Sequence, residues 1–210
     1  AMRVWQLTQQ DVDELVACEP RMAPVVAHFG LIAHDCYDDS FSGLVAIILN
    51  QQLSDQSFAQ CWARIAPPAR TDPGYLKALI ERGDYLPCTQ GKRQALHAIA
   101  TRFVSGEFSH QGLLALSKEE RRAQLHAIKG IGPWSCDMFD LMVARERDCL
   151  LTGDLGVMRG LQLCLGLDLK ALPHKERRLK EEELKAHFSP VGSFATFYLW
   201  EASNARFSPL

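Results

Sequence analysis

Residues 125–159, LHAIKGIGPWSCDMFDLMVARERDCLLTGDLGVMR, carry the most specific pattern in the chain. The segment Lys129-Gly130-Ile131-Gly132-Pro133 has two glycines one residue apart, which permit a tight turn with positive φ, and a proline suited to the first turn of a following helix. Amides left unpaired at such a turn, with the positive end of the helix dipole, can accept a phosphate. Asp154, near the end of the segment, is a candidate helix cap. The segment therefore predicts two helices joined by an anion-binding turn, followed by a third helix.

Apolar residues recur at helical spacing on both sides of this segment, and predicted helix starts separate them. We expect starts at Ser40, at Ser54 or Asp55, within Thr71-Asp72-Pro73 and within Thr89-Gln90-Gly91, and Ser117-Lys118-Glu119-Glu120 has the pattern of a capping box. No alternating strand pattern of useful length is present except around residues 3–7. The sequence predicts an all-α fold of roughly ten short helices.

We expect these helices to form one domain over residues 1–210, built from two packed helical subdomains. The first would span residues 31–108, and the second would combine residues 1–30 with residues 109–210. The second would carry both the glycine turn and Asp154, and the active-site cleft would lie between the two subdomains.

Composition excludes several classes of protein. The seven cysteines lack C-x-x-C pairs and the seven histidines lack i,i+4 partners, so no disulfide framework or structural metal site is expected, and no cofactor. The longest apolar run, residues 44–49, is too short to cross a bilayer, and the N-terminus has no signal-peptide pattern. Residues 1–91 hold 6 Lys/Arg against 11 Asp/Glu, whereas residues 92–210 hold 17 against 14. A nucleic-acid contact would therefore fall mainly in the second part.

Each candidate residue also has a purely structural interpretation. Gly130 and Gly132 could form a simple interhelical turn, and Asp154 could be only an N-cap. Trp134, Met138 and Trp200 could be ordinary core residues. The combination favours function: a helix of about 14 residues after the turn carries the chain about 21 Å away, and residues 148–153 can return it. Asp154 would then face the region of Trp134.

The chain resembles the helix-hairpin-helix DNA glycosylases, specifically the 3-methyladenine DNA glycosylase II branch. The resemblance covers roughly residues 30–205. Its most specific part is IKGIGPWSCDMF followed by GDLGVMRG at the separation found in that family. FSGLVAIILNQQLS, GKRQALHAIA and SPVGSFATFYLW are supporting matches.

The resemblance implies a role for each of these residues. Asp154 falls on the essential aspartate, which stabilises the oxocarbenium-like sugar as the N-glycosidic bond breaks. Gln52 falls on the residue that fills the space left by the flipped nucleotide. In some relatives a monovalent cation binds carbonyls near the positions of Ile128 and Ile131. The DNA backbone would contact Lys129, Gly130, Ile131 and Gly132, and the base pocket would contain Trp134, Met138 and Trp200.

Trp134 also predicts the outcome of the reaction. Relatives that cut the DNA strand carry a lysine two residues after the second hairpin glycine, where its amine forms a Schiff base with the sugar. This chain has Trp134 at that position. We therefore expect a monofunctional glycosylase of base excision repair that flips alkylated purines, such as 3-methyladenine or 7-methylguanine, out of duplex DNA and hydrolyses their N-glycosidic bond.

Two departures from the family pattern leave alternatives open. Met138 stands where some relatives have a pocket tyrosine, and Gly192 stands where many have an arginine. A glycosylase for a deaminated or oxidised base, or a noncatalytic helix-hairpin-helix DNA-binding protein, are the alternative interpretations. We expect a monomer that binds damaged duplex DNA and no membrane. It would act in the cytoplasm and nucleoid of a bacterium or in the nucleus of a eukaryote.

Overall fold

The structure is a computed structural model that describes residues 2–210, and in this part of the chain it contains thirteen α-helices, two short 3₁₀ helices and two strands. The predicted all-α class is confirmed, and the helices outnumber the ten expected because several are single turns or little more. None of the described helices has both the length and the apolar character needed to cross a membrane. The helices are α1 (Gln9–Cys18), α2 (Ala23–Phe29), α3 (Ser40–Asn50), α4 (Asp55–Ala63), α5 (Pro67–Thr71), α6 (Pro73–Glu81), α7 (Gln90–Ser105), α8 (His110–Ala115), α9 (Lys118–His126), α10 (Pro133–Met142), α11 (Leu155–Leu165), α12 (His174–Phe188) and α13 (Gly192–Ala205).

The chain divides into two compact units. Of the described residues, unit 1 comprises 2–3 and 37–144, and unit 2 comprises 4–36 and 145–210. This division corrects the expected one, which placed residues 109–144 with the C-terminal helices. They belong to unit 1 because α10 packs against both α3 and α9. The glycine turn therefore lies in unit 1, and Asp154 lies in unit 2.

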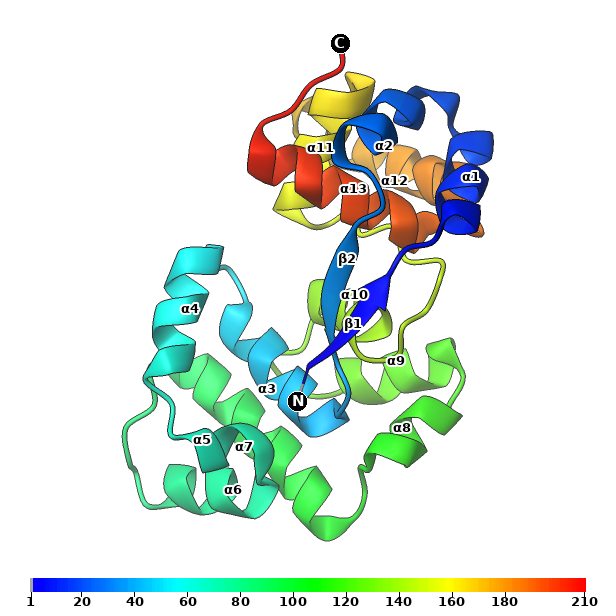
Figure 1. Cartoon of the computed structure of the whole chain (residues 1–210). Helices are drawn as coiled ribbons and strands as arrows, with labels where there is room; N and C mark the ends of the chain where they lie inside the picture. Colours follow the sequence, from blue (N-terminus) through cyan, green and yellow to red (C-terminus); the bar gives the residue numbers. More distant parts are fainter. Residues whose placement is uncertain (1) are drawn as a thin grey trace. The chain divides into compact units, whose positions relative to one another are not determined.

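Unit 1 is built around α3, whose residues 40–49 are all buried. Helices α4, α5, α7, α8 and α10 contact it, as Figure 1 shows. A helix that is covered on all sides is apolar all round, which explains the run of apolar residues in this segment. The predicted cap is displaced by one residue: the side chain of Asp39 accepts a hydrogen bond from Ser42 N (2.9 Å). Ser40 instead lies inside the helix, where its hydroxyl is 2.7 Å from His110 Nδ1.

Helix α10 is shorter than the sequence predicted. It ends at Met142 after 10 residues rather than near Arg147. Arg145 adopts a left-handed conformation with φ +56°, which a continuing α-helix cannot contain. The Arg145 guanidinium lies over the Trp5 ring, 5.4 Å from its centroid, and donates to Val4 O (3.3 Å). These contacts hold the chain in the conformation that ends the helix.

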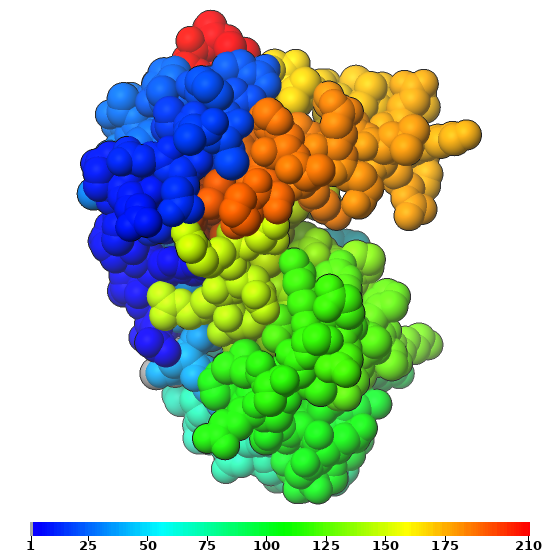
Figure 2. All heavy atoms as spheres, turned by 90° about the vertical axis from the view of Figure 1, so that its right-hand side faces the viewer, coloured from blue at the N-terminus to red at the C-terminus, as the bar shows by residue number. Residues whose placement is uncertain are grey.

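Unit 2 is organised around the contact between α11 and α13 (Figure 1). Residues 192–199 of α13 are all buried. By contrast, most residues of α12 are exposed, and Figure 2 shows its side chains, in orange, extending into solvent. Strands β1 (Met2–Gln6) and β2 (Ala33–Tyr37) pair as a two-stranded sheet. The first matches the expected strand pattern around residues 3–7, but the second, AHDCY, was not anticipated because it does not alternate between apolar and polar residues.

The α11–α13 contact depends on Gly160. A Cβ atom at this position would lie 2.7 Å from Leu199 Cβ and even closer to Leu199 O. We expect Gly160→Ala to lower the free energy of unfolding by about 1–3 kcal/mol, because two packed helices must separate. Urea titration followed by circular dichroism measures this change. Gly91→Ala is the matched control, since a Cβ there has no neighbour within 4 Å; an equal loss in both variants would contradict the prediction.

A buried carboxylate links α1, the following 3₁₀ helix (Pro20–Met22) and α12. Glu19 is 4% exposed, and it accepts hydrogen bonds from Arg21 Nη2 (2.6 Å) and Nε (3.0 Å). His187 Nε2 of α12 lies 3.0 Å from Glu19 Oε1, the oxygen that Arg21 Nη2 also contacts. The hydrogen bonds from Arg21, with a smaller contribution from His187, lower the pKa of Glu19 from 4.5 to about 2, although burial opposes this shift.

This lowered pKa predicts a pH-dependent stability. Between pH 4.5 and about 2 the unfolded chain binds a proton at Glu19 that the folded chain does not, so stability falls as pH falls. We expect the carboxylate to contribute about 1–3 kcal/mol above that range, and Glu19→Gln to remove the contribution. Urea unfolding of both proteins from pH 7 to pH 3 measures it. Glu182→Gln, at an exposed position of α12, serves as control. If the difference in unfolding free energy between the wild type and Glu19→Gln stays constant with pH, Glu19 is not the group responsible for the pH dependence.

Candidate active site

The glycine turn joins α9 to α10 in unit 1. Gly130 has φ +94°, in the region that favours glycine, and Gly132 is the N-cap residue of α10 with Pro133 in its first turn. Within the described part of the chain no side chain caps α10. The amides of its first turn and the positive helix end are therefore suited to an anion, and the adjacent Lys129 is exposed. The structure thus has the turn geometry that the sequence predicted.

Hydrogen bonds from unit 1 hold the carbonyl groups of the turn. Gln51 Nε2 donates to Gly130 O (2.8 Å), and Ile131 N donates to Ile128 O (3.0 Å). His126 Nδ1 lies 3.0 Å from Ile131 O, which fits the tautomer with its hydrogen on Nδ1. Each carbonyl oxygen has two lone pairs, so one of them is left when the oxygen accepts a single hydrogen bond. The monovalent cation expected near Ile128 and Ile131 stays a prediction.

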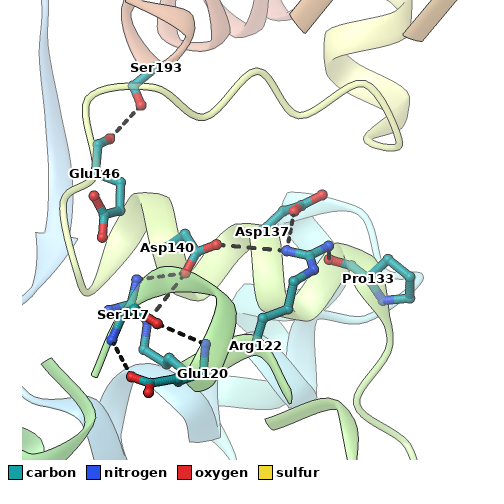
Figure 3. A network of polar contacts seen from close by, with 9 residues as sticks. Ser117, Glu120, Arg122, Pro133, Asp137, Asp140, Glu146 and Ser193 are labelled. Carbon is teal, nitrogen blue, oxygen red and sulfur yellow. Dashed lines mark hydrogen bonds and ion pairs between the residues drawn. The ribbon is translucent and has the colours of Figure 1, made fainter. Parts of the chain in front are cut away.

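Ion pairs fix the two helices that flank the turn. Arg121 of α9 is 1% exposed and donates to Asp140 Oδ1 of α10 at 2.8 Å. Arg122 reaches Asp137 Oδ1 at 2.8 Å and Pro133 O at 3.4 Å, as Figure 3 shows. Burial raises the pKa of Asp140, and Arg121 opposes this shift. The charged pairs thus join α9 to α10 immediately beside the turn.

Gln52 lies at the exposed tip that follows α3. Its φ is +57°, a left-handed conformation unusual for a residue other than glycine. Lys92 of α7 supports this tip, because its Nζ donates to Leu49 O (2.8 Å) and Gln51 O (2.7 Å). The structure therefore places the side chain predicted to enter the DNA at a projecting position of unit 1.

Asp154 is the N-cap residue of α11 in unit 2, as the sequence predicted. Its Oδ2 accepts hydrogen bonds from Val157 N (3.0 Å) and from Trp200 Nε1 of α13 (2.7 Å). The carboxylate is half-buried. Two N–H donors on one oxygen fix its orientation, which a catalytic carboxylate requires and a simple cap does not.

The Trp200 ring, which contacts this carboxylate, belongs to a cluster of aromatic rings. The ring of His34, from β2, stacks on Phe197 with centroids 4.8 Å apart, and it lies 5.3 Å from the Trp200 ring. Gly156 leaves room for the indole, since a Cβ there would be 3.1 Å from Trp200 Cδ1. Trp200 thus has two roles: it presents a ring beside Asp154, and it donates a hydrogen bond to the carboxylate.

The other two predicted pocket residues lie on α10 in unit 1. Trp134 is half-buried and Met138, one turn later, is 8% exposed. Spacing of four residues places both on one face of the helix. Their contact with a base stays a prediction.

Comparisons with known proteins agree with this geometry. No family model matches the sequence. The chain is 26% identical over 139 residues to a DNA-3-methyladenine glycosylase of Bacillus subtilis, a match covering 66% of this chain. It is 31% identical over 114 residues, 54% of this chain, to DNA-3-methyladenine glycosylase 1 of Schizosaccharomyces pombe. The solved structure of the S. pombe 3-methyladenine DNA glycosylase in complex with abasic DNA superposes with a TM-score of 0.76 at 22% identity, covering 93% of this chain and 97% of that one. The chain is thus similar in sequence to known DNA-3-methyladenine glycosylases and shares the fold of the S. pombe enzyme.

The curated relatives that the chain matches are named DNA-3-methyladenine glycosylases. The matched regions are 41% of the B. subtilis protein and 48% of the S. pombe protein, so the chain spans about half the length of these relatives or less. At 22% identity the structural match establishes the fold.

Three residues of the site were not identified from the sequence. They are Gln51, directly after α3, Lys92 in the first turn of α7 and His34 in β2. A signal was present for one of them: Lys92 follows a predicted cap, where a long cationic side chain can reach the carbonyl end of a neighbouring helix.

The departure from the family pattern at Gly192 also has a structural reason, because a Cβ there would lie 2.8 Å from Leu150 N and 2.9 Å from Asp148 Oδ1.

Proposed function

We propose that this chain is a monofunctional DNA glycosylase that flips alkylated purines out of duplex DNA and hydrolyses their N-glycosidic bond. The observation that carries the proposal is Asp154, a carboxylate at a helix N-cap that Trp200 Nε1 and Val157 N orient. The names of the curated relatives support alkylated bases as substrates.

Asp154 stabilises the charge that develops in this reaction. As the bond between the base and C1′ breaks, positive charge accumulates on the sugar, and a fixed carboxylate nearby lowers the energy of that state. The same carboxylate can hold the attacking water, which supplies the hydroxyl group at C1′. The base leaves with the bonding electrons, and the product is an abasic site.

An alkylated purine such as 3-methyladenine or 7-methylguanine is well suited to such a site. It already carries positive charge, so it leaves without strong general acid catalysis. The face of an aromatic ring attracts a cation, and Trp200 presents such a ring beside Asp154. Trp134 is the second candidate ring.

The glycine turn provides the contact to the DNA backbone. The first-turn amides of α10 and the exposed Lys129 would bind phosphate, and Gln52 would enter the stack where the base has left. Residues 92–210, which contain the turn, carry more Lys/Arg than Asp/Glu. Binding should therefore weaken as salt rises, although the acidic first part of the chain reduces the overall attraction.

Release of bases from methylated duplex DNA tests the proposal. Purified protein is incubated at low salt with DNA carrying 3-methyladenine and 7-methylguanine, with uracil, hypoxanthine and 8-oxoguanine substrates in parallel, and free bases are measured by chromatography. We expect release of the alkylated purines. Release of only a deaminated or oxidised base would assign another lesion, and binding without release of any base would indicate a noncatalytic DNA-binding protein.

Absence of strand cleavage is a separate prediction. Because Trp134 stands where strand-cutting relatives carry lysine, no amine is expected to form a Schiff base with the sugar. The labelled DNA should stay intact after base release until hot alkali cleaves the abasic site. Reaction in the presence of borohydride should give no covalent protein–DNA adduct. A trapped adduct would refute hydrolysis by water alone.

A further inference from the structure

Three parts of unit 1 meet at one junction: the end of α3, the first turns of α7 and the glycine turn. We call it the tip junction and define it by Gln51, Lys92 and Gly130. Gln51 reaches the turn, Lys92 reaches the end of α3, and Gly130 packs against α7, where a Cβ on Gly130 would lie 3.1 Å from Ala95 Cβ. Each element thus contacts the other two.

Lys92 satisfies the end of α3. The last carbonyl groups of a helix have no partner within the helix, and Lys92 Nζ donates to two carbonyls there, Leu49 O at 2.8 Å and Gln51 O at 2.7 Å. The ammonium is partly buried, and burial lowers the pKa of Lys92. The hydrogen bonds to these two carbonyl groups compensate for the free energy lost when the ammonium is removed from water.

Gln51 connects the same chain segment to the turn. Its Nε2 donates to Gly130 O and to Ser135 Oγ, both at 2.8 Å, so both hydrogens of the amide are used. Ser135 lies in the first turn of α10 and is 3% exposed. One side chain therefore holds the turn on both sides of Gly132.

Gln52 is the next residue after Gln51, so the tip junction holds the chain immediately before it. The main-chain carbonyl of Gln51 is held by Lys92 and its side chain by Gly130, immediately before the chain adopts φ +57° at Gln52. We propose that Gln51 and Lys92 are positioning residues that keep Gln52 at a fixed place relative to the glycine turn. The residue that enters the DNA stack and the turn that binds the backbone then act on the DNA as one rigid element.

This inference rests on the proposed function, because it assumes that Gln52 enters DNA at a flipped nucleotide. It gives a positioning role to Gln51 and Lys92, which do not contact the DNA themselves. Its consequence is specific: the junction should matter for recognition of a vacated stack, and it should matter less for contact with an intact duplex.

The test compares binding to two duplexes that require no catalysis. One duplex carries a tetrahydrofuran abasic analogue, and the other is undamaged. Fluorescence anisotropy measures the affinity of the protein for each. The quantity compared is the ratio of the affinity for the abasic duplex to the affinity for the undamaged duplex. We expect Gln51→Leu, Lys92→Met and Gln52→Ala each to lower this ratio about tenfold, which corresponds to about 1.4 kcal/mol of binding free energy. Lys92→Arg should restore it in part, since a guanidinium can also donate to two carbonyls.

The double variants distinguish positioning from general weakening. If Gln51 and Lys92 act through Gln52, adding Gln51→Leu or Lys92→Met to Gln52→Ala should lower the ratio no further. A merely structural role would lower the affinity for both duplexes and leave the ratio unchanged. Gln111→Leu and Lys170→Met, at exposed positions of α8 and of the 3₁₀ helix Leu169–Ala171, are the matched controls.

Three results would overturn the inference: additive effects in the double variants, an unchanged ratio in the single variants, or a wild type with no preference for the abasic analogue. Base release by the wild type is measured beside the binding. Release with additive effects rejects the junction and leaves the proposed function standing. Preference for the abasic analogue with non-additive effects, but without release of any base, rejects the proposed function and leaves the junction standing.

Discussion

Asp154→Asn is expected to lower the rate of base release by about a hundred- to a thousandfold, the usual cost of losing one electrostatic contact to a transition state. The amide has the same shape as the carboxylate, and its oxygen can still accept hydrogen bonds from Val157 N and Trp200 Nε1. The helix cap is therefore retained while the negative charge is lost. The single-turnover rate on methylated duplex DNA, with protein in excess, measures the effect on the chemical step alone.

Asp72→Asn is the matched control for this substitution. Asp72 is also an N-cap aspartate, and it accepts a hydrogen bond from Tyr75 N at the start of α6. The substitution Asp72→Asn should leave the rate of base release unchanged. Both variants should keep the affinity of the wild type for DNA with an abasic analogue. Equal rates for Asp154→Asn and the wild type would remove Asp154 from the mechanism, whatever the protein's substrate.

Arg121→Met should cause the largest loss of stability, about 3–5 kcal/mol. Arg121 and Asp140 both lie in the core at 1% exposure, and the substitution would leave a buried carboxylate without its main partner. Burial already raises the pKa of Asp140 in spite of Arg121, so the carboxylate is expensive to keep charged even when paired. Urea unfolding at neutral pH measures the loss.

Two further variants show whether the loss comes from the unpaired charge. Arg122→Met removes the neighbouring arginine, whose side chain is 36% exposed, and should cost less than about 1 kcal/mol. Arg121→Met combined with Asp140→Leu removes both buried charges and should recover much of the stability. A double variant as unstable as Arg121→Met would mean that packing, rather than the buried charge, accounts for the loss. Because the pair joins α9 to α10, Arg121→Met should also weaken DNA binding through the turn.

Local signals made most of the helix starts predictable. Helices start where the sequence predicted, and the residues that cap them are Ser54, Asp72, Thr89, Ser117 and Asp154. Each cap is a contact between a side chain and an amide three residues later. The turn at Gly130 and Gly132 was predictable for the same reason. Where the local signal was ambiguous the prediction failed: Asp39 rather than Ser40 caps α3, and α10 ends five residues early.

The division into units was not predictable from local pattern. It depends on α10 packing against α3, and the apolar residues of the two helices do not indicate which partner each will meet. The buried pair of Arg121 and Asp140 could not be predicted from local pattern either. Charged residues in a sequence usually indicate a solvent-exposed surface, and only the tertiary structure shows that these two are buried.

The order of residues along the chain thus established the all-α class, the glycine turn and the identity of Asp154 as a cap, because each follows from contacts within a few residues. The tertiary structure alone determined what holds those features in place. Trp200 donates to Asp154 across 46 residues, and Gln51 donates to Gly130 across 79. A hydrogen bond between distant residues requires two helices to be packed at one distance and rotation, and that arrangement is a property of the folded core.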